Sequence, residues 1–293
     1  MPRTDLTSKG RTLVERVGTR GARTLREAPL ELAYRIDRHH QATIARPLDR
    51  VGEETVANLR GGHAAVVPLD DLDLASTPAM ERTAHEVLSR LAAQEPLLDA
   101  HGMPPAQLIW MASEVPELRA WATEPRLTAI VQRYLEVPAA FQGVHARVEL
   151  VNAGQVVTEL WHRDVEDRRM LKCFVFPDEV TLAHGPFEYL PDPDIDRRTR
   201  RDVRRAIQRA GSGGAMGITD DEMAALVGDA GWRAVTVPAR SAVFVDPTAC
   251  FHHSRPRSRQ RRALFFVYTS AYPLRPEYCT QYWDDRFPPV PSI

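Results

Sequence analysis

Apolar and polar residues alternate along residues 141–150, and this period of two predicts a β-strand with one buried face and one polar face. The apolar positions are Val144, Ala146, Val148 and Leu150, and the polar positions between them are His145, Arg147 and Glu149. The pattern allows two interpretations of the polar face, which meets either solvent or a wet pocket. In the second case, His145 and Arg147 would line that pocket.

The same criteria predict several further short strands. They are expected at residues 63–69, 155–161, 170–176, 186–190, 234–237, 242–246 and 263–269. Helical periodicity predicts a helix over 80–94 and further helical segments between 105 and 135, with an apolar side suited to packing against a sheet. Short strands separated by turn residues are typical of an all-β sandwich or barrel. The predicted fold class is therefore mainly β with flanking helices.

Two stretches depart from this β-rich pattern. Residues 1–60 are polar, arginine-rich and helical in periodicity, and we expect a helical N-terminal extension that packs on a main domain formed by residues 61–293. Residues 192–232 are expected to form a helical insertion in that domain, where Thr219 followed by Glu222 predicts a helix start. The arginine run of the insertion either contacts an anionic substrate or, as is more common, forms a solvated helix face.

Composition excludes several classes of protein. The 293 residues include 38 basic and 39 acidic side chains, and the net charge of -1 argues against a globally basic nucleic-acid-binding protein. No apolar run approaches the ~18 residues of a membrane span. Three cysteines without regular spacing fit a reducing cytoplasm better than a disulfide framework. We expect a cytoplasmic monomer or homodimer that acts on a small-molecule substrate.

Residues 159–164 carry the first candidate site, because His162 and Asp164 lie two apart after an apolar run. In an extended chain such residues point to the same face, so an imidazole and a carboxylate are available to one metal ion. A later segment has His252 and His253 in an expected turn after a strand. Either histidine would complete a facial triad of two histidines and one carboxylate, which suits Fe(II) and leaves positions open for other ligands and O2.

An arginine pair, Arg261 and Arg262, begins the strand that follows these histidines. A guanidinium binds a carboxylate through two parallel hydrogen bonds, as the far carboxylate of an α-keto-acid co-substrate requires. Strand alternation means that only one of the two arginines faces inward. Lys172, in the predicted strand 170–176, is expected to keep its ammonium group in solvent, and a contact with substrate or co-substrate is the alternative.

Together these motifs resemble the phytanoyl-CoA dioxygenase-like family of Fe(II)/2-oxoglutarate-dependent oxygenases. The resemblance covers residues 62–272, with its core at 156–191 and 236–270. It rests on an ordered set of segments, which are Trp161-His-Arg-Asp164, Phe174–Val180, Gly185-Pro-Phe-Glu-Tyr-Leu-Pro191, Ser241-Ala-Val-Phe-Val-Asp246, Cys250-Phe-His252 and Arg261 followed by Tyr268-Thr-Ser270. A His-x-Asp pair alone is common by chance, whereas the ordered set is specific.

Carried over to this chain, the resemblance implies that His162, Asp164 and His252 are the iron ligands and form the catalytic centre. It also implies that Arg261, supported by Ser254, binds the C5 carboxylate of 2-oxoglutarate. The iron, 2-oxoglutarate and O2 would then be the cofactor and co-substrates of the protein.

Two departures from the family pattern keep alternatives open. A small residue usually follows the distal histidine, whereas here His253 follows His252 and is the alternative ligand. The arginine is doubled, so Arg262 is the alternative to Arg261. The residues that precede the histidines and follow the arginines favour His252 and Arg261.

The resemblance further implies a fold and an activity. The fold would be a double-stranded β-helix, a cupin-like jelly roll, with helices against one sheet. The activity would be hydroxylation of an unactivated C–H bond of a small molecule, with release of succinate and CO2. Apart from the resemblance, the near-absence of lysine beside many arginines indicates a GC-rich, bacterial genome, and with it a role in secondary metabolism. Asp164 favours hydroxylation, or a desaturase or epoxidase variant, because related halogenases lack this carboxylate. The alternative from another class is a non-catalytic, cupin-like protein that binds a metal or a small molecule.

Overall fold

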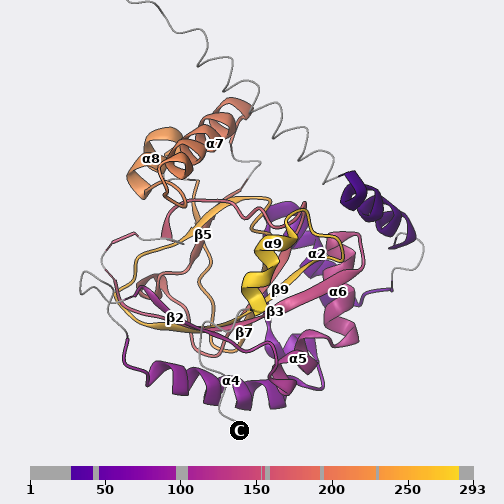
Figure 1. Cartoon of the computed structure of the whole chain (residues 1–293). Helices are drawn as coiled ribbons and strands as arrows, with labels where there is room; N and C mark the ends of the chain where they lie inside the picture. Colours follow the sequence, from indigo (N-terminus) through magenta and orange to yellow (C-terminus); the bar gives the residue numbers. More distant parts are fainter. Residues whose placement is uncertain are drawn as a thin grey trace, which may run out of the picture.

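The computed structural model describes residues 28–41, 46–96, 105–152, 154–155, 159–191, 195–228 and 231–283. Within these residues, the strands form two antiparallel sheets (Figure 1). The larger sheet has the strand order β1-β7-β4-β9-β3-β2, and the smaller sheet has the order β6-β5-β8. The strands are β1 (Ala64–Pro68), β2 (Gln107–Met111), β3 (Ala139–Glu149), β4 (Leu171–Phe176), β5 (Phe187–Leu190), β6 (Arg233–Ala234), β7 (Ser241–Val245), β8 (Phe251–Ser254) and β9 (Arg261–Ser270).

The larger sheet separates two hydrophobic cores. From β3, Val144 and Ala146 point into the core shared with the helices, as the alternation in sequence predicts. On the opposite face, Phe174 of β4 packs with Phe187 of β5 in a second core between the two sheets. Two antiparallel sheets packed face to face in this order form the jelly roll, so the predicted fold class is confirmed.

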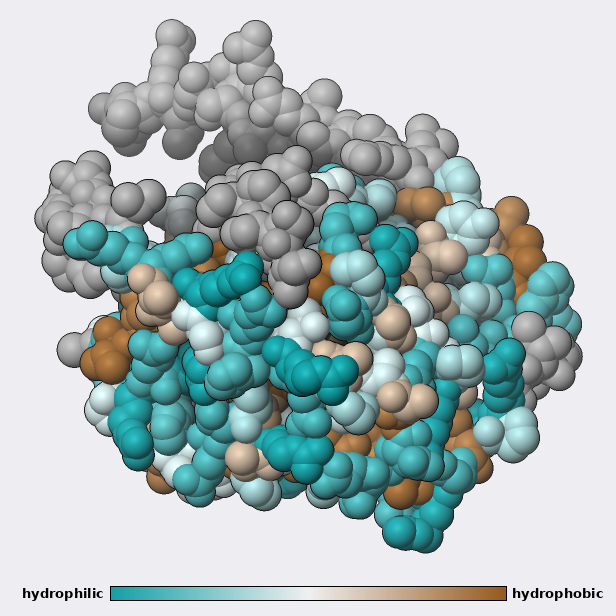
Figure 2. All heavy atoms as spheres, turned by 90° about the horizontal axis from the view of Figure 1, so that it is seen from below, coloured by the Kyte–Doolittle hydropathy of each residue, from teal (hydrophilic) through white to brown (hydrophobic). Residues whose placement is uncertain are grey.

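Helices cover the outer face of the larger sheet (Figure 1). They are α2 (Arg50–Gly62), α3 (Leu69–Leu72), α4 (Thr77–Ala92), α5 (Pro116–Ala122) and α6 (Pro125–Leu135). Leu88 of α4 and Trp121 of α5 are fully buried, and each such side chain stabilises the fold by about 1.5–3 kcal/mol or more. The face of the molecule on which α4 lies is predominantly hydrophilic (Figure 2), because the apolar side of the helix is turned toward the sheet.

The N-terminal part of the chain contacts the main domain in the described residues. Residues 28–41 are helical, whereas residues 1–27 and 42–45 lie outside the described residues. Arg168 bonds Glu31 at 2.8 Å and lies over the ring of Tyr34 at 4.5 Å. Helix α2 runs across the predicted boundary at residue 60, and its residue Leu59 belongs to the main core.

Some predictions of secondary structure are wrong. Residues 107–111, predicted within helical segments, form the edge strand β2, because pairing with β3 decides the structure of a short apolar run that fits either element. In the predicted strand 155–161, residues 156–158 lie outside the described residues. Glu159 and Leu160 are not in a strand, and Trp161 makes only an isolated bridge.

The histidine pair lies in a strand rather than in the predicted turn. Residues 251–254 form β8, which pairs with β5 so that His252 faces Tyr189 and His253 faces Glu188 across the ladder. Four residues are too few to show the alternation of a strand, so β8 is recognised only by its pairing with β5.

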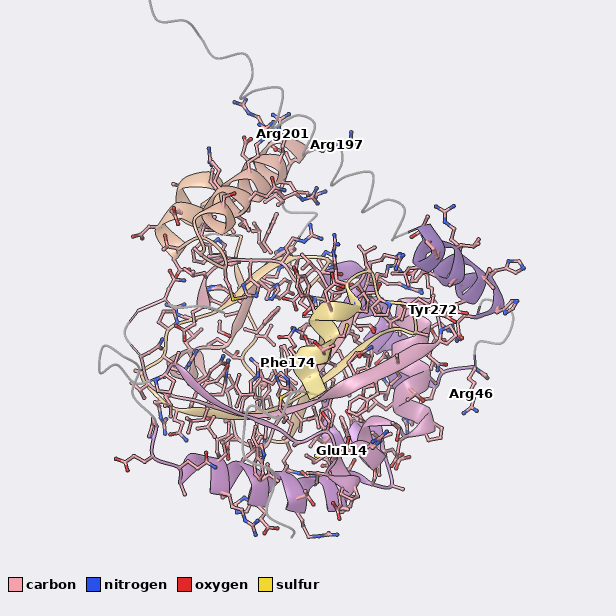
Figure 3. All side chains as sticks on the ribbon, in the orientation of Figure 1. Arg46, Glu114, Phe174, Arg197, Arg201 and Tyr272 are labelled. Atoms are coloured by element: carbon pink, nitrogen blue, oxygen red, sulfur yellow. The ribbon has the colours of Figure 1, made fainter. Side chains whose placement is uncertain are left out.

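The insertion forms two helices, α7 (Arg197–Ser212) and α8 (Asp220–Val227), outside the sheets. Thr219 caps α8, and Glu222 bonds back to the amide of Thr219 at 2.8 Å, so this predicted helix start is confirmed. Arg197 and Arg201 lie on α7, outside the sheets, whereas Phe174 lies in the interior (Figure 3). Among the described helices, none is long and apolar enough to cross a membrane. The remaining short helical elements are η2 (Leu182–His184), α9 (Pro276–Cys279) and η4 (Thr280–Trp283).

Candidate metal centre

The two segments that carry the candidate ligands are joined directly by their backbones. The amide of His162 donates to the carbonyl oxygen of His252, and the amide of His252 donates back to His162, both at 3.0 Å. These bonds hold the two rings 4.4 Å apart between centroids. The amide of Asp164 donates to the carbonyl oxygen of Pro247 at 3.1 Å, which fixes Asp164 against the segment between β7 and β8.

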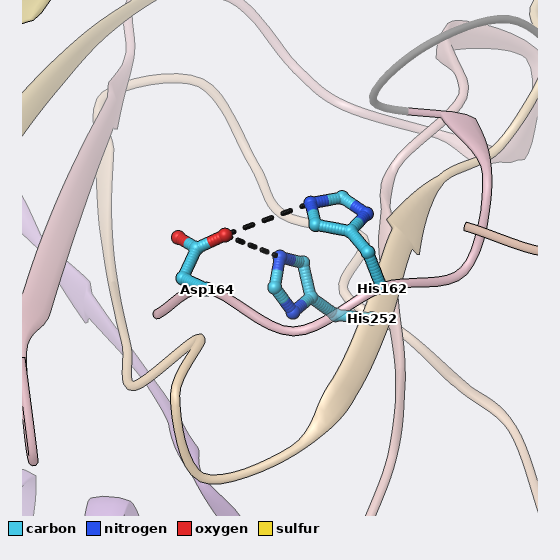
Figure 4. Close-up of side chains that lie close together, drawn as sticks. All are labelled: His162, Asp164 and His252. Atoms are coloured by element: carbon cyan, nitrogen blue, oxygen red, sulfur yellow. Dashed lines mark ion pairs between the residues drawn. The ribbon is translucent and has the colours of Figure 1, made fainter. Parts of the chain in front are cut away.

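His162, Asp164 and His252 direct their side chains to one point (Figure 4). The Nε2 atoms of His162 and His252 lie 3.6 and 3.7 Å from Oδ1 of Asp164, and all three ligand atoms lie within 4.8 Å of one another. Across the part of the chain that the structure describes, no other set of three or more His, Cys, Asp or Glu side chains meets this criterion. One ion can therefore contact all three atoms.

The other nitrogen of each histidine fixes the tautomer. Nδ1 of His162 lies 2.6 Å from the carbonyl oxygen of Leu160, and Nδ1 of His252 lies 3.3 Å from that of Cys250. A carbonyl oxygen only accepts hydrogen bonds, so Nδ1 carries the proton in both rings. The lone pair then lies on Nε2, the atom that faces Asp164.

Electrostatics favour the ligand form of all three groups. Burial lowers the pKa of His252 to about 3 and also lowers the pKa of His162, so both rings are neutral near pH 7. Burial raises the pKa of Asp164, but Lys172 and the two histidines together lower it by more. The pKa of Asp164 therefore lies below its ordinary range. Two neutral imidazoles and one carboxylate are the donor set of non-haem Fe(II) centres, so these residues fit that ion.

Lys172 contradicts the prediction of an ammonium group in solvent. Its side chain is only 15% exposed, and Nζ lies 2.5 Å from Oδ2 of Asp164. Although burial lowers the pKa of Lys172, the carboxylate of Asp164 raises it above its ordinary value. The error has a physical reason, because a buried lysine needs a counter-charge and the one used here comes from a neighbouring segment.

Of the two arginines, Arg261 faces inward. It is buried in β9, whereas Arg262 points to the outer surface and pairs with Asp178 at 2.8 and 3.0 Å. The alternation of the strand thus separates the two residues, with Arg261 on the side of the candidate metal ligands.

The guanidinium of Arg261 is held on several sides. It donates to the carboxylate of Glu149 and to the carbonyl oxygen of Gly185, and Nη2 lies 3.4 Å from Oγ of Ser254. Burial raises the pKa of Glu149, but Arg261, Arg257 and Arg147 together lower it by more, and Glu149 forms a buried ion pair with Arg261. The polar face of β3 is therefore in the interior of the molecule, where its partner residues could not be read from the sequence.

A cavity of about 160 Å³ connects the candidate metal ligands with Arg261. Phenylalanine rings form much of its wall, from both sheets. The lining residues are Arg147, His162, Asp164, Glu166, Lys172, Phe174, Phe176, Phe187, Met216, Pro247, His252, His253, Ser254, Arg261, Phe265, Gln281 and Tyr282. An apolar wall with a few convergent polar groups is typical of a small-molecule site.

The C-terminal segment contributes residues that sequence reasoning missed. Tyr282, in η4, donates from its hydroxyl to Oε1 of Glu166 at 2.9 Å, and its ring packs on His145 with centroids 5.0 Å apart. No periodicity or motif in this stretch signals a role. Arg147 lines the cavity, as the pocket interpretation of the polar face predicts, whereas His145 is buried but is not among the lining residues.

His253, the alternative ligand, belongs to a separate network. Its Nε2 atom lies 2.9 Å from Glu188, and its ring stacks on Trp161 with centroids 4.1 Å apart. Trp161 in turn donates from Nε1 to Asp220 at 2.7 Å, at the start of α8. The network thus connects the insertion to the segment that carries His162.

The insertion forms part of the cavity wall. Ile218 exchanges two backbone hydrogen bonds with Trp161, at 2.7 and 3.1 Å, and Met216 lines the cavity. A side chain on Gly217 would overlap the carbonyl oxygen of Trp161, so only glycine permits this approach.

No protein-family profile matches the chain, and no curated protein matches its sequence. Solved structures do match its fold. The epimerase SnoN in complex with Fe3+, α-ketoglutarate and nogalamycin RO is 16% identical, with a TM-score of 0.52 over 83% of this chain and 93% of that one. EvdO2 from Micromonospora carbonacea var. aurantiaca is 20% identical, with a TM-score of 0.51 over 78% and 94%.

HygX from Streptomyces hygroscopicus, with nickel and 2-oxoglutarate bound, is 12% identical, with a TM-score of 0.50 over 77% of this chain and 88% of that one. At these identities the likeness concerns the fold. The fold is that of the iron- and 2-oxoglutarate-dependent oxygenases, as the motifs in the sequence predict.

Proposed function

We propose that the protein is an Fe(II)- and 2-oxoglutarate-dependent oxygenase that hydroxylates an unactivated C–H bond of a small molecule in secondary metabolism. His162, Asp164 and His252 would hold the iron through Nε2, Oδ1 and Nε2. When bound, Fe(II) supplies the activation of O2, coupled to conversion of 2-oxoglutarate into succinate and CO2. The similar folds of SnoN and HygX, which were solved with α-ketoglutarate or 2-oxoglutarate, support the assignment of the co-substrate.

The chain's own residues would bind, orient and protect the reactants. Arg261 would take the far carboxylate of 2-oxoglutarate through the N–H groups that remain after its bonds to Glu149 and Gly185, and Ser254 would support the same group. The rings of Phe174 and Phe265 would exclude water beside the co-substrate, which strengthens its polar contacts.

The observation that carries the proposal is the shared cavity. The three candidate ligands and the guanidinium of Arg261 line the same cavity. A molecule with an α-keto acid at one end and a carboxylate at the other matches both groups. A protein that binds only a metal has no need of the buried arginine.

Two measurements test the proposal. We expect the Mn(II)-loaded protein to bind 2-oxoglutarate without O2, and the Fe(II)-loaded protein to form succinate from 2-oxoglutarate slowly in air. Asp164→Ala is expected to abolish both. Binding without succinate formation, even with a panel of candidate substrates, would favour the non-catalytic alternative, and absence of metal-dependent binding would rule the oxygenase out.

A further inference from the structure

Glu166 places a second carboxylate on the wall of the cavity, beside the candidate metal ligand Asp164. Its side chain is buried, and these two are the only carboxylates among the described residues that line the cavity. Lys172 is near enough for Glu166 to raise its pKa, but its ammonium group bonds Asp164 instead. Among the described residues, no cation lies within ion-pair distance of Glu166, so its charge is not balanced by a direct partner.

Three neutral groups donate hydrogen bonds to this carboxylate. The amide of Val165 donates to Oε2 of Glu166 at 2.9 Å, whereas the hydroxyl of Tyr282 and the side-chain amide of Gln281 donate to Oε1 at 2.9 and 3.4 Å. A carboxylate has about four acceptor positions, so Oε2 keeps one of them. Neutral donors compensate a buried charge only in part. Glu166 therefore suits a further donor that also brings positive charge.

The fold holds Tyr282 in place beside this carboxylate. Ser113, after β2, accepts from the amide of Val144 at 3.0 Å and donates to the carbonyl oxygen of Tyr282 at 3.1 Å. Gly143 permits this approach, because its φ is 141° and a side chain there would overlap both Ser113 and that carbonyl oxygen. Burial raises the pKa of Tyr282, so its hydroxyl keeps the proton that it donates to Glu166. The polar group is thus built into the cavity wall from β3 and the C-terminal segment.

We propose that Glu166 binds an ammonium group of the primary substrate inside the cavity, with Tyr282 and Gln281 holding the carboxylate in place. This inference rests on the proposed function and deepens it, because it names amines as the class of molecule that is oxidised. An ammonium group supplies both a donor for Oε2 and the missing positive charge, whereas a hydroxyl group supplies only the donor. The apolar part of such a molecule would lie against the phenylalanine rings of the wall.

The test compares Glu166→Gln with Glu179→Gln, the same substitution at an exposed residue that does not line the cavity. The Mn(II)–2-oxoglutarate complexes are titrated at pH 7 without O2, first with benzylamine and benzyl alcohol and then with 2-phenylethylamine and 2-phenylethanol. The probes are aromatic because the cavity wall is aromatic. At this pH each amine is protonated and offers no lone pair to the metal. The melting temperature shows whether Glu166→Gln is folded.

We expect the unsubstituted protein and Glu179→Gln to bind the amines more tightly than the alcohols by about tenfold or more, and Glu166→Gln to lose this preference. Glu166→Asp keeps the charge but shortens the side chain, so the preference should fall by a smaller factor. This variant decides the question if Glu166→Gln does not fold.

The proposal is overturned if the unsubstituted protein does not prefer the amines, if the preference is unchanged in the folded variant, or if Glu179→Gln loses it equally. If the unsubstituted protein binds no 2-oxoglutarate, the proposed function fails. The same titrations without 2-oxoglutarate then still decide the role of Glu166.

Discussion

Nζ of Lys172 lies 2.5 Å from Oδ2 of Asp164, on the opposite side of the carboxylate from the two histidines. The lysine therefore fixes the rotation of the carboxylate and leaves Oδ1 for a metal ion. Lys172→Met keeps the length of the side chain and removes this bond. We expect it to weaken Mn(II) binding by about 10–100-fold, the usual effect of losing an outer partner of a ligand. Lys172→Arg should recover part of the affinity, and equal affinity in all three proteins would show that Lys172 does not orient Asp164.

Substitution of each adjacent histidine distinguishes the two candidate ligands. His252→Ala should reduce Mn(II) affinity by more than about 100-fold, since a lost ligand costs more than a lost outer partner. His253→Phe keeps a ring against Trp161 but removes the contact of His253 with Oε2 of Glu188, whose Oε1 still accepts from Arg255. This variant should be destabilised by about 1–3 kcal/mol and still bind Mn(II). Calorimetric titration measures the affinity, and the reverse result would make His253 the ligand.

We expect substitutions of the neighbouring residues Arg261 and Arg262 to have different effects on 2-oxoglutarate binding and on stability. Arg261→Gln should weaken 2-oxoglutarate binding by about 10–100-fold, because charge-assisted hydrogen bonds are lost, and should destabilise the protein because Glu149 is left buried and unpaired. The double variant Glu149→Gln/Arg261→Gln should recover stability but not affinity. Arg262→Gln, on the outer surface, should change neither quantity. Loss of binding in Arg262→Gln instead would exchange the two roles.

The Glu149–Arg261 pair also predicts a loss of stability in acid. Burial raises the pKa of Glu149, but Arg261, Arg257 and Arg147 lower it by more, so its value in the folded protein lies below 4.5. A lowered pKa contributes stability that is complete above the unfolded value and is lost as the pH falls through the folded value. We expect the melting temperature to decrease as the pH is lowered below about 4.5. The decrease should be smaller in the Glu149→Gln/Arg261→Gln double variant. Equal slopes for the two proteins would contradict this account.

Gly217 tests the contact between the insertion and the metal-ligand segment. A methyl group there would overlap the carbonyl oxygen of Trp161, so Gly217→Ala should lower the melting temperature and increase hydrogen exchange at residues 195–228. The matched control is Gly211→Ala, in α7, where an added methyl group meets nothing within 4 Å and helix propensity improves. Similar exchange in both variants would mean that the insertion is docked by other contacts.

The sequence predicts the fold more completely than the site. Alternation around Val144 and Ala146 depends only on local burial, and these residues lie in the core as expected. Strand β2 and the β8 position of His252 depend on partner strands, which no local pattern records. The fold decides which side chains lie near the charged groups of Lys172 and Arg147, so the sequence alone does not identify these partners.

In the site, the family resemblance implies His162, Asp164 and His252 as the ligands, and the structure brings these three together. The same reasoning left Arg261 and Arg262 as alternatives, and their opposite orientations follow from the pairing of β9 with β3 and β4. Tyr282 and Met216 line the cavity from segments that share no motif with it. Residues that lie in a recognisable motif can be identified from the sequence, whereas residues that only form the wall of the cavity cannot.

The reciprocal backbone hydrogen bonds between His162 and His252 join the two ends of the segment that lies between these residues. The insertion with α7 and α8 lies between these two residues in the chain. Changes in the insertion that keep its contacts with Trp161 can therefore leave the distance between the two rings the same. Natural variation, or deliberate exchange of this segment between related proteins, can therefore alter which molecules are accepted without rebuilding the centre that would transform them.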